Sequence, residues 1–342
     1  MGSMKKIKVE DAVGMVLAHD MTRITRGEFK GVAFRKGHIV QKADIPELLR
    51  IGTHYLYVLD LGAGELHEDD AAHRIAAAIS APDLEFTEPR EGKINIITPK
   101  PGLLKINVDG LLAINTMDDI IVATLKNNFP CKKGQVVAAT RIIPLTIGAE
   151  QIDALEKMLR QAETILRVKP FRPLKVGAVV TGSEVYDGLI ADDFDPSIGK
   201  KIIEAGCTLE RKILVPDDVE RIRDAILELK DLGCEMIITT GGLSVDPDDV
   251  TRQGVKMTGA QETFYGSPVL PGAMLLISVL EKTPVISLPA CVFYHERTVF
   301  DLIFPRVLAG ETIRKEDIAA MGHGGLCMNC ETCHYPVCSF GR

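Results

Sequence analysis

The sequence lacks the aromatic side chains and the positive charge that nucleic-acid-binding proteins commonly use. Tryptophan is absent, and Phe, Trp and Tyr together make up 5% of the 342 residues. Aspartate and glutamate outnumber lysine and arginine by 47 to 40, so the formal net charge is −7. Bases are bound by stacking on aromatic rings, and phosphate backbones by clustered cations. We therefore expect neither nucleic acid nor an anionic membrane surface among the partners.

The sequence also has no apolar run long enough to cross a bilayer and no signal peptide. Eight cysteines are present, and four of them are scattered: Cys131, Cys207, Cys234 and Cys291. Scattered thiols are typical of a reducing compartment rather than of a disulfide scaffold, so we expect a cytoplasmic protein. A content of 46% hydrophobic and 25% charged residues is ordinary for a globular chain, and the length allows two or three domains.

The first half of the chain is predicted to hold two small domains and a bridging helix. Residues 4–80 mix short strands with helices, which indicates an α+β domain. Residues 90–148 carry short β-rich segments separated by turn signals such as Asp109-Gly110, which predicts a β-rich domain or barrel. Apolar residues recur on one face over 149–168, which predicts an amphipathic helix within a bridging segment, 149–172.

From residue 173 onward, predicted strands alternate with predicted helices. This alternation indicates an α/β domain over 173–312, a parallel or mixed sheet with helices on both faces. In such sheets, ligands bind outside the carboxyl ends of the strands. Three loops leave those ends, at 181–184, 241–249 and 288–290, and we expect them to converge on one pocket.

The central motif of this domain is the stretch EMIITTGGLSVDPDDVT at 235–251. An apolar, β-branched strand runs into Gly241-Gly242, and a helix begins near Val250. A glycine turn before a helix start offers free N–H groups to an anion, and carboxylates in the same loop suit a divalent cation beside a phosphate. The alternative is that Asp248 or Asp249 only caps the next helix.

Together these loops resemble the molybdopterin-binding domain family of molybdenum-cofactor biosynthesis, over residues 173–310. The resemblance rests on four motifs: TGSE at 181–184, VPDD at 215–218, TTGGLSVDPDDVT at 239–251, and Pro271-Gly272. The opening segment VEDAVGMVLAHDMT is similar to the N-terminal segment of the molybdopterin molybdenumtransferase branch of this family.

The resemblance implies that the domain binds molybdopterin or its nucleotide form, the adenylate, with phosphate held by backbone N–H groups. Asp249 would be the catalytic carboxylate and Mg²⁺ ligand at a phosphoanhydride, supported by Glu184, with Asp246 and Asp248 as second-choice Mg²⁺ ligands. It also implies a transferase-like enzyme that forms a homo-oligomer. The residues implied to contact the cofactor are Thr181, Gly182, Ser183, Gly241, Gly242, Ser244, Pro271 and Gly272.

Several departures from the family pattern favour binding over metal insertion. The Asn expected after TGSE is missing from Ala191-Asp192-Asp193-Phe194, and Leu270 and Ala273 stand where lysines flank the Pro-Gly motif. The Pro-Gly-Asn-Pro loop is replaced by PACV at 289–292. A non-catalytic binding or sensing module is therefore one alternative. Candidates to replace the missing cations are Lys200, Lys201, Arg252, His295 and Arg297.

A second branch of the family offers another enzyme. GGLSVDPDDVT and TGSEVYDGLIADD also resemble the competence-damage-inducible family. That branch implies Mg²⁺-dependent cleavage of a nucleotide pyrophosphate such as ADP-ribose, with Asp248 and Asp249 as metal ligands. The N-terminal half does not match this branch.

The remaining four cysteines lie in a tail, 321–342, whose first residues read as a flexible connector. The tail cysteines are Cys327, Cys330, Cys333 and Cys338, spaced C-x2-C-x2-C-x4-C. Such density predicts a site for Zn²⁺ or an iron–sulfur cluster, and the spacing is one residue longer than a ferredoxin run. The alternatives are a disordered tail with reactive thiols and transient thiol chemistry on sulfur or metal.

Overall fold

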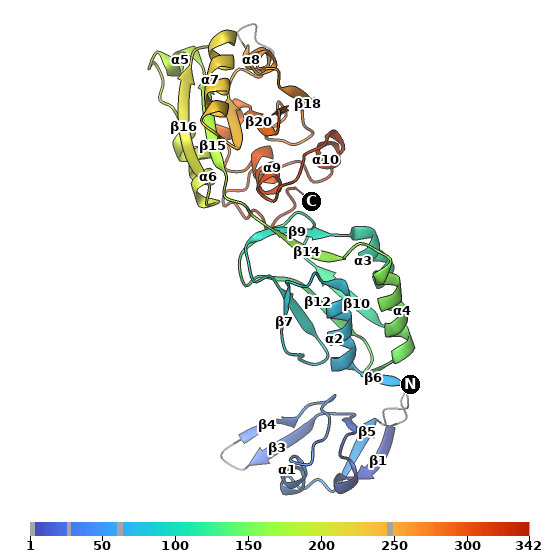
Figure 1. The fold of residues 1–342 in the computed structure, drawn as a ribbon. Coiled ribbons are helices and arrows are strands. Elements are labelled where there is room, and N and C mark those ends of the chain that lie inside the picture. The colour runs from blue at the N-terminus through green and yellow to red at the C-terminus, as the bar shows by residue number, and fades with distance from the viewer. Residues whose placement is uncertain (1–3, 26–28, 60–63, 245–248, 342) are drawn as a thin grey trace. The chain divides into compact units, whose positions relative to one another are not determined.

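The computed structural model describes residues 4–25, 29–59, 64–244 and 249–341 (Figure 1). The chain divides into two compact units, Met1–Val168 and Lys169–Arg342. Among the described residues, no helix is both long and apolar enough to cross a bilayer.

The N-terminal part of unit 1 is a small α+β fold. Strands β1 (Met4–Lys8), β5 (Tyr55–Leu59) and β2 (Val16–Leu17) form a sheet in the order β1-β5-β2. A hairpin of β3 (Met21–Thr25) and β4 (Phe29–Phe34), the turn η1 (Val9–Asp11) and helix α1 (Ile45–Arg50) complete it. The buried side chains that form its core include Leu17, Leu48, Leu56 and Val58.

The rest of unit 1 packs three helices around short sheets. The helices are α2 (Glu68–Ile79), α3 (Val108–Asn115) and α4 (Ala149–Arg160). One sheet has the order β10-β12-β8-β7, made of Ile120–Thr124, Val136–Ile142, Ile94–Ile97 and Glu85–Phe86. The others pair β11 (Pro130–Cys131), β9 (Gly102–Ile106) and β14 (Leu166–Pro170), and β13 (Thr146–Gly148) with β6 (Glu65–His67).

Two local predictions in this unit are wrong. Asp109-Gly110 is not a hairpin turn but the first turn of α3, because the side chain of Asn107 accepts a hydrogen bond from the Gly110 N–H at 3.0 Å and caps the helix. The helix expected over 149–168 ends at Arg160, and the chain continues as strand β14. Its buried residues Ile152 and Leu155 belong to the core of unit 1.

Unit 2 is built on a six-stranded mixed sheet, which confirms the predicted fold class. The strand order is β16-β15-β17-β20-β19-β18. The first four are parallel: Thr208–Val215, Lys175–Thr181, Met236–Thr240 and Thr283–Leu288. The last two, Leu276–Leu280 and Gln261–Tyr265, are antiparallel to their neighbours.

Alternating side chains of this sheet bury both faces. On β17, Ile238 packs into one core with residues of α9 (Val299–Leu308), while Ile237 packs into another with α7 (Val219–Asp231). Period-2 alternation puts successive residues on opposite faces, so a strand apolar at every position needs cover on both sides. The other helical segments are α5 (Ser183–Tyr186), the π-helical turn η2 (Asp195–Gly199), α6 (Lys200–Glu204), α8 (Thr251–Met257), η3 (Ala290–Phe293) and α10 (Lys315–Ala320).

Candidate ligand site at the carboxyl edge of the sheet

The loops after β15 and β17 are joined through one buried hydroxyl. Thr181, at the end of β15, donates its hydroxyl to the carbonyl of Thr240 at the end of β17, at 2.9 Å. The same oxygen lies 3.1 Å from the hydroxyl of Thr251, the first residue of α8. Two of the three predicted loops therefore converge, and Thr181 acts in their assembly rather than as an exposed ligand contact.

The TGSE turn is also anchored to the loop that precedes α7. Ser183 donates its N–H and its hydroxyl to the same carboxylate oxygen of Asp217, at 2.8 and 3.1 Å. Asp218 caps α7 by accepting the N–H of Arg221 at 2.9 Å. The VPDD motif thus has two structural roles that reading the sequence did not assign. A capping Asp at 218 was a readable signal, whereas the contact of Asp217 depends on tertiary structure.

The glycines at this edge allow neighbouring parts of the chain to approach the backbone closely. Gly241 and Gly242 have φ of +88° and +59°. A side-chain carbon at Gly241 would lie 2.7 Å from the Thr181 carbonyl oxygen, and one at Gly242 would lie 2.4 Å from the Thr251 hydroxyl. Both positions therefore require glycine because neighbouring loops press on them.

Two of the N–H groups expected to hold phosphate are already used. The Gly182 N–H donates to the carbonyl of Val215 and the Gly241 N–H to the carbonyl of Leu288, each at 3.3 Å. These bonds are long, but they extend the sheet. The expected phosphate cradle of Gly182 and Gly241 N–H groups is thus not open in this structure, and an anion would have to displace these carbonyls.

The carboxylates of the site differ in how far they are exposed to solvent. Glu184 lies in the single turn α5 and is exposed, while Asp249 is half-buried immediately before α8. The residue at the N-cap position of α8 is Val250, which makes no side-chain capping hydrogen bond. Ser244 is exposed. The second-choice Mg²⁺ ligands, Asp246 and Asp248, lie outside the described residues.

Pro271 and Gly272 contact the start of α9. The carbonyl of Pro271 accepts the N–H of Val299 at 3.0 Å. A side-chain carbon at Gly272 would lie 2.4 Å from a methyl group of Val299. This motif therefore positions the start of α9.

Buried hydroxyls with spare hydrogen-bonding capacity lie at the same strand ends. The side-chain oxygens of Thr239, Thr240 and Ser287 are buried and have no hydrogen-bond partner in the described part of the chain. Thr239 and Ser287 are register partners on β17 and β20. Buried polar atoms in native proteins normally have a partner, including bound water or ligand. This edge therefore has buried hydroxyls that a bound water or ligand could satisfy.

A cavity of about 260 Å³ lies between η2 with α6 and the loop after β20. We call it the η2 cavity; its lining includes Ser197, Lys200, Lys201, His295 and Arg297. Three formal positive charges there, on two lysines and one arginine, face two lining carboxylates, Glu204 and Glu296.

The candidate replacement cations are largely paired already. Lys201 and Arg297 both bind the buried carboxylate of Asp301, at 2.8 and 2.9 Å. Arg252 pairs with Glu262 at 2.7 Å. Lys200 pairs with the exposed Glu204 at 3.9 Å. The structure therefore does not restore the strongly cationic anion pocket that the missing lysines would provide.

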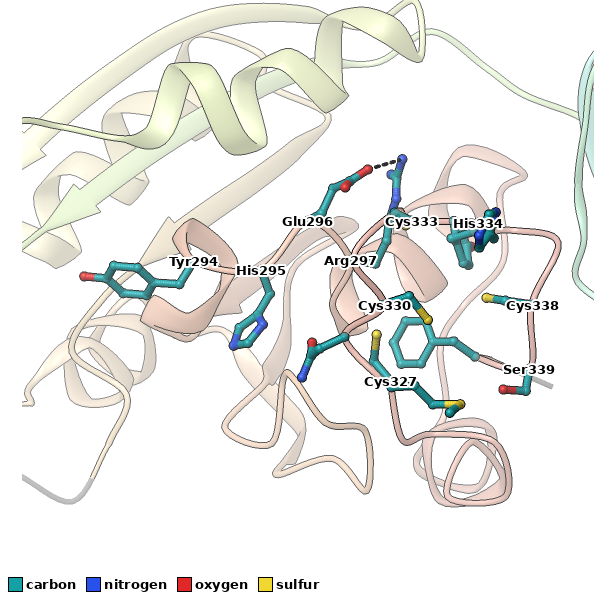
Figure 2. Close-up of a pocket in the computed structure, with 14 residues that line it drawn as sticks. Tyr294, His295, Glu296, Arg297, Cys327, Cys330, Cys333, His334, Cys338 and Ser339 are labelled. Atoms are coloured by element: carbon teal, nitrogen blue, oxygen red, sulfur yellow. Dashed lines mark ion pairs between the residues drawn. The ribbon is translucent and has the colours of Figure 1, made fainter.

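The tail cysteines line a different cavity, of about 420 Å³, shown in Figure 2. We call it the tail cavity. The residues Tyr294, His295, Glu296 and Arg297 line both it and the η2 cavity. With the side chains as they stand, no three potential ligands among the residues described here are grouped so that they could hold a metal ion.

Two family models match the chain. Residues 177–309 match a model described as a probable molybdopterin binding domain, and residues 6–60 match a domain of unknown function. The first match covers the strands and loops that build the carboxyl edge.

Among curated proteins, the chain is similar to a CinA-like protein of Citrifermentans bemidjiense, 32% identical over 97 residues, which are 28% of this chain and 23% of that protein. It is also similar to a molybdopterin molybdenumtransferase of Synechococcus elongatus, 24% identical over 144 residues, which are 40% of this chain and 36% of that protein. The chain thus spans less than two fifths of the length of either relative.

Among solved structures, the tungsten cofactor synthesizing protein MoaB from Pyrococcus furiosus is 20% identical, with 40% of this chain and 93% of that chain covered and a TM-score of 0.34. The motifs in the sequence, the mixed sheet and the matching model agree on one assignment. Over residues 177–309, this chain is similar to the family of probable molybdopterin binding domains.

Proposed function

We propose that unit 2 binds molybdopterin or its nucleotide form at the carboxyl edge of the sheet. The observation that carries this proposal is the junction of the TGSE and TTGG loops through the Thr181 hydroxyl, within the matched domain. Loops that converge outside the carboxyl ends of parallel strands are the usual position of a ligand in an open α/β sheet. The hydroxyl of Thr240, which has no hydrogen-bond partner among the residues that the structure describes, lies beside this junction and adds polar capacity for such a ligand.

The charge of the site supports binding more than metal insertion. Lys201 and Arg297 are held by Asp301, so the η2 cavity can offer Lys200 and His295 to a phosphate without breaking a buried ion pair. Insertion of molybdate needs a second anion beside the ligand phosphate, and the chain lacks the paired cations that would offset it. The protein therefore acts first as a binder of the cofactor.

A transferase-like step on the bound ligand is the finer part of the proposal. Asp249, half-buried before α8, would hold Mg²⁺, and exposed Glu184 would support it. When bound, Mg²⁺ would offset charge on the phosphoanhydride. Carboxylate oxygens are ligands that Mg²⁺ prefers, so the donor set fits this ion. A homo-oligomer, which the resemblance implies, is also proposed and can be checked by analytical ultracentrifugation.

Thermal unfolding of the full chain with molybdopterin, with and without Mg²⁺, tests the binding proposal. A ligand bound only by the folded state adds RT ln(1 + [L]/Kd), about 2.7 kcal/mol at one hundred times Kd. We expect molybdopterin to raise the melting temperature of wild type, and Asp249→Asn to lose only the Mg²⁺-dependent part. Asp187→Asn, at an exposed carboxylate just after α5, is the control. No shift with molybdopterin at any Mg²⁺ concentration would refute the proposal.

Cleavage of a nucleotide pyrophosphate is a second candidate. The similarity of the GGLSVDPDD loop to the competence-damage-inducible family favours it, and Asp249 would again be the metal ligand. Release of AMP from ADP-ribose, dependent on Mg²⁺ and lost in Asp249→Asn, would assign this activity. Neither ligand explains the tail cysteines, which line a cavity of their own.

A further inference from the structure

The tail is a closed loop and not a free connector. The N–H of Gly341 donates to the carbonyl of Gly324 at 2.9 Å, so the two ends of the segment meet. The N–H of Cys327 donates to the carbonyl of Leu270 at 2.8 Å, which ties the start of the loop to unit 2. All four tail cysteines lie between Gly324 and Gly341. Their thiols are therefore confined to one small volume even before any ligand binds.

Aromatic side chains hold this loop against α9. Phe340 is 2% exposed and belongs to the core that includes α9. Tyr335 donates its hydroxyl to the carbonyl of Asp301 at 2.9 Å, and its ring lies edge-to-face with that of Phe340 at 6.2 Å. Burial of an aromatic ring stabilises a docked segment, because its apolar surface is removed from water. A tail with merely reactive thiols would not need such an anchor.

The tail cavity brings the four thiols to one place. All of the tail cysteines line it, and all are free thiols. Cys330 is exposed, and the other three are half-buried, so an ion can reach them from solvent. His295 and His334 also line the cavity (Figure 2). The rings of Tyr335 and Phe340 form part of its wall.

The guanidinium group of Arg297 lies in the wall of the same cavity as these thiols. The guanidinium of Arg297 lies over the ring of Tyr335, 5.4 Å from its centroid, and interacts with the thiol of Cys333. Its Nε is buried and has no hydrogen-bond partner in the described residues. A divalent ion with four thiolates carries a net charge of about −2, part of which the half-buried guanidinium of Arg297 would offset in addition to its pairing with Asp301. Arg297 thus complements a thiolate centre better than it complements neutral thiols.

We propose that the tail cysteines bind one thiophilic metal centre through four thiolates. Thiolate ligation is shared by a Zn²⁺ ion and by an iron–sulfur cluster, and soft sulfur ligands select these over Mg²⁺ or Ca²⁺. On binding, each thiol releases its proton to solvent as its sulfur–metal bond forms. The sulfurs are not grouped around a point at present, but each cysteine has three staggered χ1 positions, and the closed loop limits how far its backbone must move.

The metal content of the full chain, purified without oxygen, tests the proposal. We expect about one Zn²⁺ per chain without acid-labile sulfide, or iron with acid-labile sulfide; the two results assign an ion or a cluster. Cys330→Ser and Cys338→Ser should each lower the metal content at least several-fold. Cys291→Ser, which changes a cysteine outside the tail cavity, should leave it unchanged. Metal that is absent from wild type, or that survives both tail substitutions, overturns the proposal.

A second measurement does not depend on whether the variants fold. Metal-free wild type, prepared with a chelator under reducing conditions, is titrated with Co²⁺ and followed by the absorption of cobalt–thiolate bonds. Saturation at about one Co²⁺ per chain, reversed by Zn²⁺, supports the site. The proposal is contradicted if no cobalt–thiolate absorption appears and if iron with sulfide also fails to reconstitute a cluster. Oxidation of the thiols to disulfides without metal binding would assign redox chemistry to the tail instead.

Discussion

Ser183 and Asp217 are held together by three hydrogen bonds, although 34 positions separate them in the sequence. Ser183 donates its N–H and its hydroxyl to the Asp217 carboxylate at 2.8 and 3.1 Å, and its hydroxyl accepts the Asp217 N–H at 3.2 Å. The turn that leaves β15 is therefore fixed by the loop that leaves β16. Since the turn carries Glu184 and borders the proposed ligand site, this contact sets the shape of the site.

Asp217→Ala should weaken molybdopterin binding as well as stability. Loss of hydrogen bonds to a charged acceptor costs about 1.5–3 kcal/mol and frees the TGSE turn. The neighbouring change Asp218→Ala removes only the cap of α7, which is worth about 1 kcal/mol. Urea denaturation and ligand titration of both variants separate the two roles. Equal ligand affinities would show that the turn does not shape the site.

Gly242→Ala should destabilise unit 2 beyond the penalty of its backbone conformation. The left-handed conformation alone costs a non-glycine residue about 1–2 kcal/mol. The added carbon would also lie 2.4 Å from the Thr251 hydroxyl. Gly188→Ala is the matched control, because Gly188 has φ of +73° and no atom within 4 Å of the added carbon. We expect a lower urea midpoint for Gly242→Ala than for Gly188→Ala. Similar midpoints would mean that α8 can shift away from the added carbon with little loss of unfolding free energy.

Glu68 makes the stability of unit 1 depend on pH. Burial raises the pKa of its carboxyl above the ordinary value of 4.5, and this outweighs the opposing charges of His67 and of Arg141, 4.0 Å away. A raised pKa means that the folded state binds the proton more tightly. Stability is therefore highest below pH 4.5 as far as this group is concerned, and it falls as pH rises through the folded pKa.

Glu68→Gln should remove this fall and stabilise unit 1 at pH 7. Denaturation of the variant and of wild type between pH 4 and 7 measures the effect. Glu88→Gln, an exposed glutamate of the same unit, should leave the pH profile as in wild type. If the unfolding free energy of wild type instead changes with pH as that of the variant does, then ionisation of Glu68 carries no energetic penalty in the folded state.

Removal of the tail metal should weaken binding of the domain ligand. Tyr294, His295, Glu296 and Arg297 line both cavities, so an unanchored tail changes one wall of the η2 cavity. We expect chelator-treated protein to bind molybdopterin several-fold more weakly and to recover when Zn²⁺ is restored. Identical affinities with and without metal would show that the two cavities act independently.

The sheet of unit 2 could be predicted from the sequence because each strand carries a strong local signal. The strand Met236–Thr240 is buried at every position and ends directly before Gly241-Gly242, as predicted. The end of the α4 helix at Arg160 was missed because the apolar period continues into β14, where Leu166 is buried from a strand instead. Periodicity cannot distinguish these two cases over so few residues.

The roles of the site residues were harder to predict, because they depend on neighbours far along the chain. Gly241 and Gly242 indicated a ligand approach, whereas the crowding atoms belong to Thr181 and Thr251. The tail was predicted as a flexible connector followed by a metal site. Nothing local marks the closing bond between Gly324 and Gly341, so the docking of the tail could not be read from its composition.

Calorimetric titration of the full chain with molybdopterin tests the central claim most directly. The account predicts one saturable site per chain, with lower affinity in Asp217→Ala and unchanged affinity in Asp218→Ala. Inorganic phosphate at the same concentrations should give no comparable heat, since the charges of the η2 cavity are largely paired. Absence of saturable binding by molybdopterin, or equal binding by phosphate alone, would contradict the claim that this edge of the sheet is a molybdopterin site.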